Sequence, residues 1–175
     1  MTIEEVKKAQ KGDKKSFEKI IMEIIDNLYR VAYGILKNQE DASDAISNAT
    51  LKAYEKIETL RQLEFFKTWI TRILINECNI IIKQKQKVTY IENYIENQNN
   101  TYANNNEEKI DVQQAINKLE KELKQIVILY YFDDLSIEEI SNILEIPKGT
   151  VKSRLSRARQ CLAKELLKDY KEDIG

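Results

Sequence analysis

Apolar residues recur at intervals of three and four positions through most of this chain, and this helical period constrains its fold more than any other feature. The period is clearest near the N-terminus, where the apolar positions are Phe17, Ile20, Ile21, Ile24, Leu28, Val31, Ile35 and Leu36. Residues that break helices are scarce, since the 175 residues include only four glycines and one proline. Together these features predict an all-α protein.

The first 87 residues predict a compact bundle of four helices. Thr2 and Glu5 fit the capping-box pattern for a short first helix, and Asp13 can cap a second helix. Two more helices are expected, one from about residue 41 and one over about 65–83. Because the connections between these helices are short, we expect a bundle in which sequence neighbours pack together.

Residues 88–108 differ in composition from the sequence on either side. They contain a run of asparagines, four glutamates and no Lys or Arg, and they lack a sustained apolar period. A polar, unpatterned stretch of this kind predicts a flexible linker. We therefore expect two small helical domains, residues 1–87 and 109–175, that move independently of each other.

The C-terminal part has the pattern of a helix-turn-helix unit. Ser136 and Glu139 form another capping box at the start of a short helix. The turn EIPK follows at residues 145–148, and Pro147 near the first turn favours the start of a longer helix. A short helix, a tight turn and a longer helix in this order are the plan of a helix-turn-helix.

The longer helix concentrates positive charge in a chain whose formal net charge is only −1, because residues 147–164 contain six basic side chains and no acidic one. Val151, Leu155, Ala158 and Leu162 share one apolar face at helical spacing. The remaining positions carry side chains suited to base edges and phosphates in the major groove. These candidates for DNA contact are Lys148, Thr150, Lys152, Ser153, Arg154, Ser156, Arg157 and Arg159.

A solvated basic surface without a ligand is the alternative interpretation of this stretch, and the helix-turn-helix context favours DNA binding. Residues 133–145 hold five acidic groups and no basic one. The acidic charges of residues 133–145 and the basic charges of residues 147–164 cancel in the net charge of the chain, but they lie on different helices. DNA would therefore bind only the basic face.

The composition argues against other functions. Histidine is absent, which removes the commonest general base and the commonest zinc ligand. The two cysteines, Cys78 and Cys161, lie far apart in the sequence. We therefore expect them to be reduced thiols in a cytosolic protein. No nucleophile–base pair is apparent, so we expect neither an enzyme nor a cofactor or metal site. We see no signal peptide or membrane-spanning stretch and expect a cytoplasmic location.

A close resemblance to a known family lies in residues 135–162, which read LSIEEISNILEIPKGTVKSRLSRARQCL. This stretch resembles the promoter-reading helix-turn-helix of the sigma-70 family, in its extracytoplasmic-function group. The N-terminal half agrees, with KGDKKSFEKII, LYRVAYGILKNQEDASDAISNATLKAYEKI and FFKTWITRILIN similar to the polymerase-binding and −10-reading domain of that group. The resemblance implies a sigma factor that binds core RNA polymerase and recognises promoter −10 and −35 elements. It also implies an inhibitory anti-sigma partner, often membrane-anchored, and no cofactor.

The resemblance implies roles for matching positions in the N-terminal half. The clamp helices of the polymerase's large subunit would meet Asp41, Asp44, Ser47 and Asn48, for which a merely solvated face is the alternative. The −10 strand would be opened and read by Phe65, Phe66, Thr68, Arg72, Asn76 and Lys83. The neighbouring Trp69, Ile70, Ile73 and Leu74 are expected in the core rather than against DNA.

Four positions depart from the family pattern. Ser47 stands where Gln is usual, Thr50 where an aromatic residue is usual, and Ile80 where Asp is usual. The first two weaken the expected affinity for polymerase. Glu145 replaces a glycine of the helix-turn-helix turn and is expected to cost turn stability, since residues other than glycine tolerate a positive φ less well.

The competing hypothesis is a stand-alone repressor or activator that uses the same helix-turn-helix as a dimer on a palindrome. That hypothesis leaves residues 1–87 without a role.

Overall fold

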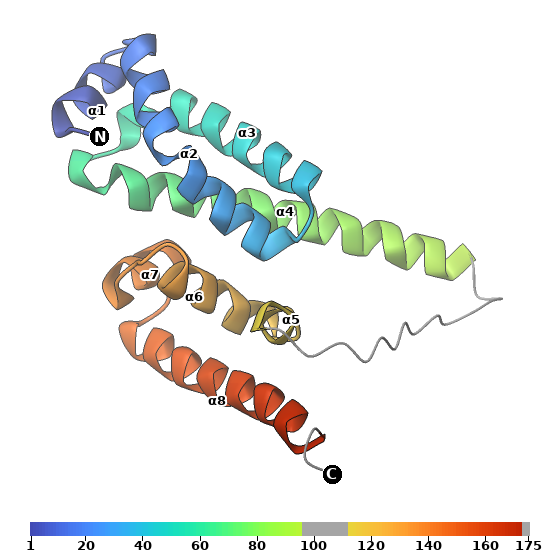
Figure 1. Ribbon diagram of the computed structural model, residues 1–175. Coiled ribbons are helices and arrows are strands. Elements are labelled where there is room, and N and C mark those ends of the chain that lie inside the picture. Colours follow the sequence, from blue (N-terminus) through green and yellow to red (C-terminus); the bar gives the residue numbers. More distant parts are fainter. Residues whose placement is uncertain (96–111, 173–175) are drawn as a thin grey trace.

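The computed structural model describes residues 1–95 and 112–172, which form helices in two groups (Figure 1). The N-terminal group contains α1 (Ile3–Gln10), α2 (Lys14–Leu36), α3 (Gln39–Lys56) and α4 (Phe66–Ile95), with short 3-10 turns at Ile57–Thr59 and Leu63–Phe65. The C-terminal group contains α5 (Val112–Asn117), α6 (Lys121–Tyr131), α7 (Ile137–Leu144) and α8 (Lys148–Glu172). The all-α prediction is confirmed. No helix in these residues is long and apolar enough to cross a membrane.

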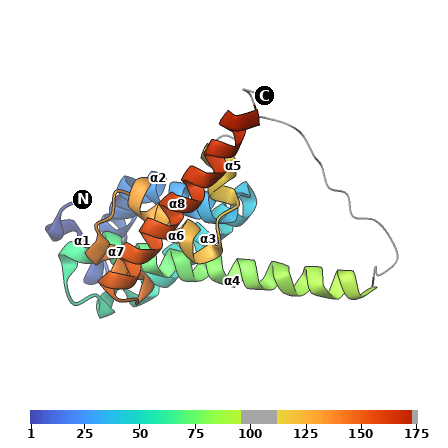
Figure 2. The same ribbon diagram turned by 90° about the horizontal axis from the view of Figure 1, so that it is seen from below.

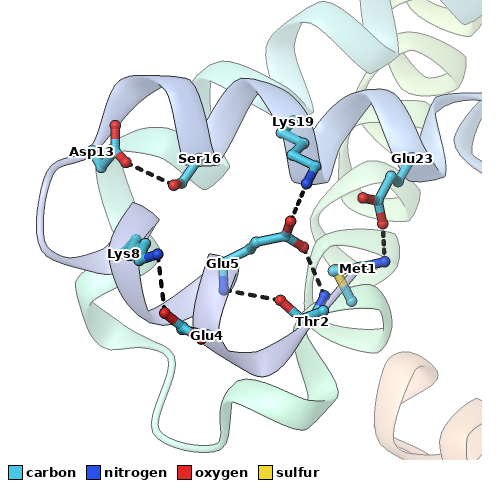
Figure 3. Close-up of polar contacts among 9 residues, drawn as sticks. All are labelled: Met1, Thr2, Glu4, Glu5, Lys8, Asp13, Ser16, Lys19 and Glu23. Atoms are coloured by element: carbon cyan, nitrogen blue, oxygen red, sulfur yellow. Dashed lines mark hydrogen bonds and ion pairs between the residues drawn. The ribbon is translucent and has the colours of Figure 1, made fainter.

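The predicted capping residues begin the helices. The Thr2 hydroxyl accepts a hydrogen bond from the backbone N–H of Glu5 at 3.3 Å, and the Glu5 carboxylate accepts from the N–H of Thr2 at 2.9 Å (Figure 3). The Asp13 carboxylate caps α2 through the N–H of Lys15 at 3.1 Å. Asn38 caps α3, which therefore begins slightly before the expected residue 41. These bonds satisfy backbone donors that a helix start leaves without partners.

Helix α4 is longer than the sequence predicted and projects beyond the other helices (Figure 2). It continues past Lys83 to Ile95, so residues 88–95 of the expected linker are helical. These residues contain neither glycine nor proline, and extending an existing helix adds one hydrogen bond for each residue fixed. The polar composition concealed the apolar spacing of Val88, Ile91 and Ile95. The rest of the expected linker, 96–108, lies outside the described residues.

The two groups share one core, contrary to the expectation that they are independent. A single cluster of buried apolar residues includes Leu28 of α2 and Ile70 of α4 together with Ile128 of α6 and Ile140 of α7. Helix α2 packs against α6, and α4 packs against α7. The prediction of two helical groups is confirmed, but in this structure the groups lie against each other.

Helices α2 and α6 of the two groups cross closely at Gly34. A Cβ atom added at Gly34 of α2 would lie 3.2 Å from side-chain carbons of Ile128 on α6. Glycine within a helix costs about 0.5–1 kcal/mol relative to alanine, and here the missing side chain lets the two backbones approach.

Candidate nucleic-acid and polymerase interfaces

Helix α8 buries the predicted apolar face and exposes the predicted basic one. Val151, Leu155 and Ala158 are buried against the other helices of the C-terminal group. Six of the eight candidates for DNA contact are exposed, namely Lys148, Lys152, Ser153, Ser156, Arg157 and Arg159, while Thr150 and Arg154 are half-buried. The exposed face therefore presents hydroxyl groups and cations on a rigid helix, as a major-groove reader requires.

Two of these cations pair weakly with carboxylates. Lys148 Nζ lies 2.7 Å from Glu138 Oε1, and Arg157 lies 3.5 Å from Glu120 Oε1. All four side chains are more than half exposed, and exposed pairs of this kind contribute at most about 1 kcal/mol. A phosphate or a base edge can therefore replace either carboxylate.

Arg159 is held differently, by two aromatic side chains of α6. Its Nε donates a hydrogen bond to the Tyr131 hydroxyl at 2.8 Å. Its guanidinium lies 5.9 Å from the ring centroid of Tyr130 and 6.0 Å from that of Tyr131, within the range of cation–π attraction. The hydrogen bond to Tyr131 also raises the pKa of Arg159 above its ordinary value. Arg159 is thus fixed on the flank of the basic face.

The turn between α7 and α8 carries the expected backbone strain. Glu145 has φ 54° and ψ 41°, the left-handed conformation that glycine adopts without penalty. For other residues this conformation costs about 1–2 kcal/mol. The turn is supported by Ser141, whose hydroxyl donates to the Ile146 carbonyl at 2.6 Å.

The −10 candidates divide between surface and core. Phe65 is 45% exposed, and Arg72, Asn76 and Lys83 are also exposed along α4. Phe66 is fully buried, so its assignment to DNA contact is wrong.

The reason is the apolar spacing of α4, in which Phe66 shares one stripe with the fully buried Ile70 and Leu74. Trp69 and Ile73 pack partly buried against the same core, as expected. Thr68 is nearly buried, with only 9% of its surface exposed.

A hollow of about 380 Å³ lies beside the exposed −10 candidates. Phe65, Thr68 and Arg72 line it together with Trp69 and the segment Leu60–Gln62. Its remaining wall belongs to the C-terminal group, through Asn142 and Ile143 of α7.

The predicted polymerase-binding strip lies on the outer face of α3. Asp44, Ser47 and Asn48 are exposed and Asp41 is half-buried. The opposite face of α3 consists of buried small residues, Ala42, Ala45, Ala49 and Ala53. Lys85 of α4 donates to Asp41 Oδ2 at 2.6 Å, and a shallow hollow of about 400 Å³ separates the strip from α4. Of the family departures at this end, Thr50 is half-buried and Ile80 is exposed.

Sequence reasoning missed the polar contacts between the two groups. The Asp133 side chain is only 1% exposed, and its Oδ1 atom accepts from Asn27 of α2 at 2.8 Å and pairs with Lys67 of α4 at 2.9 Å. The other carboxylate oxygen, Oδ2, is buried without a hydrogen-bond partner. No local pattern indicates partners so distant in the sequence.

Two further contacts join α4 to α7 and its C-terminal cap. Thr68 donates to Glu139 Oε1 at 3.4 Å, and Arg72 forms an ion pair with Glu145. Burial by itself would raise the pKa of Glu139, but hydrogen bonds from Ser136 and Thr68 outweigh burial and lower it. Acidic groups of the C-terminal group thus meet hydroxyl and basic groups of α4.

Comparison with known proteins accounts for both halves of the chain. Residues 20–88 match the family described as Sigma-70 region 2, and residues 109–162 match the family described as Sigma-70, region 4. Over 176 residues the chain is 30% identical to the ECF RNA polymerase sigma factor SigW of Bacillus subtilis, covering 92% of this chain and 94% of the relative. It is 28% identical over 173 residues to the ECF RNA polymerase sigma-E factor of Escherichia coli K12, covering 90% of each.

Solved structures share the fold. CnrH, determined in complex with the cytosolic domain of CnrY, has a TM-score of 0.73 at 16% identity, covering 95% of this chain and 97% of that one. The sigma factor RpoE of Bartonella quintana, determined with the anti-sigma factor NepR, has a TM-score of 0.72 at 25% identity, covering 88% and 98%.

Proposed function

The chain belongs to the sigma-70 family, in its extracytoplasmic-function group, and directs RNA polymerase to promoters; we propose which of its surfaces perform each part of this task. It carries out no reaction of its own and acts by binding, as a sigma factor does. The proposed division assigns α8 to the −35 element, the exposed face of α4 to the −10 element and the outer face of α3 to polymerase.

The assignment of α8 is supported by the contrast between its buried apolar face and its exposed basic face. Lys152, Ser153, Ser156 and Arg157 point away from the buried stripe and would enter the major groove. Lys148 and Arg159 lie nearer the edges, where they would hold phosphates.

The assignment of α4 is supported by exposed aromatic, amide and cationic groups beside a hollow. A strand that is opened needs pockets for unstacked bases and cations for its backbone. Phe65 and Arg72 supply these two functions at the hollow, Thr68 adds a hydroxyl, and Asn76 and Lys83 continue the exposed face along the helix.

The α3 strip would contact the clamp helices of the polymerase's large subunit through Asp44, Ser47 and Asn48. The hydrogen bond from Lys85 would orient the Asp41 carboxylate beside them. We further propose an inhibitory anti-sigma partner, because a relative of the same fold was solved with one. A cytoplasmic location follows from a function at core polymerase.

Site-specific photo-crosslinking in the assembled holoenzyme–promoter complex tests this division. A benzoylphenylalanine at Ser156 is expected to crosslink to the upstream duplex, one at Phe65 to the downstream single strand, and one at Ser47 to the polymerase's large subunit. Glu18, which is exposed on α2 outside the three surfaces, is the matched control and should not crosslink to DNA. Crosslinks from Ser156 and Phe65 to the same promoter element would overturn the division.

A further inference from the structure

A hollow of about 520 Å³ lies between the C-terminal part of α2 and the helices α5 and α6, and we call it the α2–α5 hollow (Figure 1). None of the residues assigned to the −35 element, the −10 element or polymerase lines it. The proposed division of surfaces therefore gives this hollow no role.

The walls of the α2–α5 hollow are mostly aromatic rings and aliphatic groups. Tyr29 and Tyr33, one turn apart on α2, stack with their ring centroids 5.8 Å apart and their planes at 12°. Both side chains stay partly exposed, at 37% and 42%. Ile116 of α5 and Ile128 of α6 supply buried aliphatic groups from the C-terminal group. Walls of this composition suit the apolar body of a small molecule.

Two cations border the hollow without an acidic partner. Lys37, half-buried at the C-terminal cap of α2, donates from Nζ to the Gln113 side-chain oxygen at 3.2 Å. Arg30 donates to Asn27 Oδ1 at 2.7 Å. In the part of the chain that the structure describes, neither cation forms an ion pair. Because an ammonium group carries three protons, Lys37 can bind a further acceptor while it keeps its bond to Gln113.

A third cation adds to the positive charge at this end of α2. Lys124 lies one turn before Ile128 on α6 and donates to the Ile35 carbonyl at 3.3 Å. Burial lowers the pKa of both Lys37 and Lys124, and the positive charge of Lys37 lowers the pKa of Lys124 further. An anion bound beside these ammonium groups would offset their burial and their mutual repulsion.

We propose that the α2–α5 hollow binds a small organic anion, whose flat apolar body lies against Tyr29 and Tyr33 and whose acidic group binds Lys37 and Arg30. A carboxylate or a sulfonate would accept charge-assisted hydrogen bonds from both cations. The site is separate from the three surfaces assigned to transcription, so the proposal does not depend on those assignments.

Fluorescence titration of the full-length chain with anilinonaphthalene sulfonate tests the acidic group. This dye has a flat apolar body and one sulfonate, whereas phenylnaphthylamine has the same body without the charge. The chain should bind the sulfonate dye at a single saturable site and more tightly than the neutral dye.

Lys37→Gln should weaken binding of the sulfonate dye at least about fivefold, because it removes a charge-assisted hydrogen bond from a half-buried cation. Binding of the neutral dye should not change. Lys15→Gln is the matched control, since it removes an exposed cation at the other end of α2, and it should leave the binding of both dyes unchanged.

A bulky substitution tests where the apolar body lies. Asn117 is exposed at the end of α5 and lines the hollow, so Asn117→Trp should fill it and weaken binding of both dyes. Gln114→Trp is the matched control, because Gln114 is exposed on the same helix outside the hollow. In the wild type, NMR signals of the Ile116 and Ile128 methyl groups should shift when the sulfonate dye is added.

Two results would overturn the proposal. One is equal affinity for the sulfonate dye in the wild type, Lys37→Gln and Asn117→Trp. The other is a loss of neutral-dye binding in Lys37→Gln as large as the loss of sulfonate binding, since Lys37 would then shape the hollow without binding the acidic group. Circular dichroism shows whether each variant folds, and if Asn117→Trp does not fold, Lys37→Gln carries the test.

Discussion

Truncating Arg159 separates anchoring from sequence reading on α8. Arg159 lies on the flank of the basic face and is fixed by the Tyr131 hydroxyl and two aromatic rings. If it holds one phosphate, Arg159→Ala removes about 0.9 from the slope of log affinity against log salt. Between 50 and 200 mM salt, the ratio of wild-type to variant affinity should then shrink about 3.5-fold.

The effect should be the same for every −35 sequence, because a phosphate contact carries no base information. Arg157→Ala should behave differently. Arg157 points away from the buried stripe and has only a weak, exposed partner in Glu120. Its loss should cost about 1–3 kcal/mol on the preferred −35 sequence and relax discrimination at one or two bases.

Promoter binding by reconstituted holoenzyme, measured across a salt series and single-base −35 variants, distinguishes the two roles. Tyr131→Phe is the matched variant for positioning, since it removes only the hydroxyl that accepts from Arg159. It should weaken binding less than Arg159→Ala and leave base preference unchanged. An unchanged salt slope in Arg159→Ala, or altered base preference in Tyr131→Phe, would refute the reasoning.

Other predictions address the remaining surfaces and the core. Reversing the charge of Asp41 and Asp44 should weaken core binding in gel filtration while leaving far-UV circular dichroism unchanged, and an unfolded double variant would show that the strip is structural. Phe66→Ala should lower the free energy of unfolding by about 3–5 kcal/mol in urea titrations, whereas Phe65→Ala should change it far less but impair strand opening; equal losses would contradict the assigned burial. The pKa of Glu139 is lowered in the folded protein, so the ionised carboxylate stabilises the fold at pH values above 4.5, the ordinary pKa of a glutamate. This stabilisation is lost as the pH falls below 4.5. The free energy of unfolding of Glu139→Gln should therefore fall less between pH 5 and pH 3 than that of the wild type. An equal fall in both proteins would contradict this prediction.

Local features of the fold were accessible from the sequence because their causes are local. Thr2 and Ser136 cap helices through residues three positions away, and the apolar face of α8 follows from spacing alone. The strain at Glu145 was also predictable, since the turn of a helix-turn-helix requires a positive φ at that position.

The arrangement of the two groups was not accessible in this way. Asp133 meets Asn27 and Lys67 across long separations, and Gly34 meets Ile128 through a close crossing that no local pattern marks. Phe66 was wrongly assigned to DNA contact because the resemblance grouped it with Phe65 in an aromatic cluster. Its side chain is buried because α4 begins at Phe66, which places this residue on the buried face of the helix.

Transcription start-site mapping tests the central claim most directly. Core polymerase supplied with the wild-type chain should initiate on genomic fragments at sites that share an upstream and a downstream element. With Arg157→Ala, the upstream element should lose preference at one or two positions while the downstream element stays the same. Lys164→Ala, which removes an exposed cation two turns further along α8, is the matched control and should leave both elements unchanged. An unaltered upstream element with Arg157→Ala would contradict the assignment of α8 to −35 recognition.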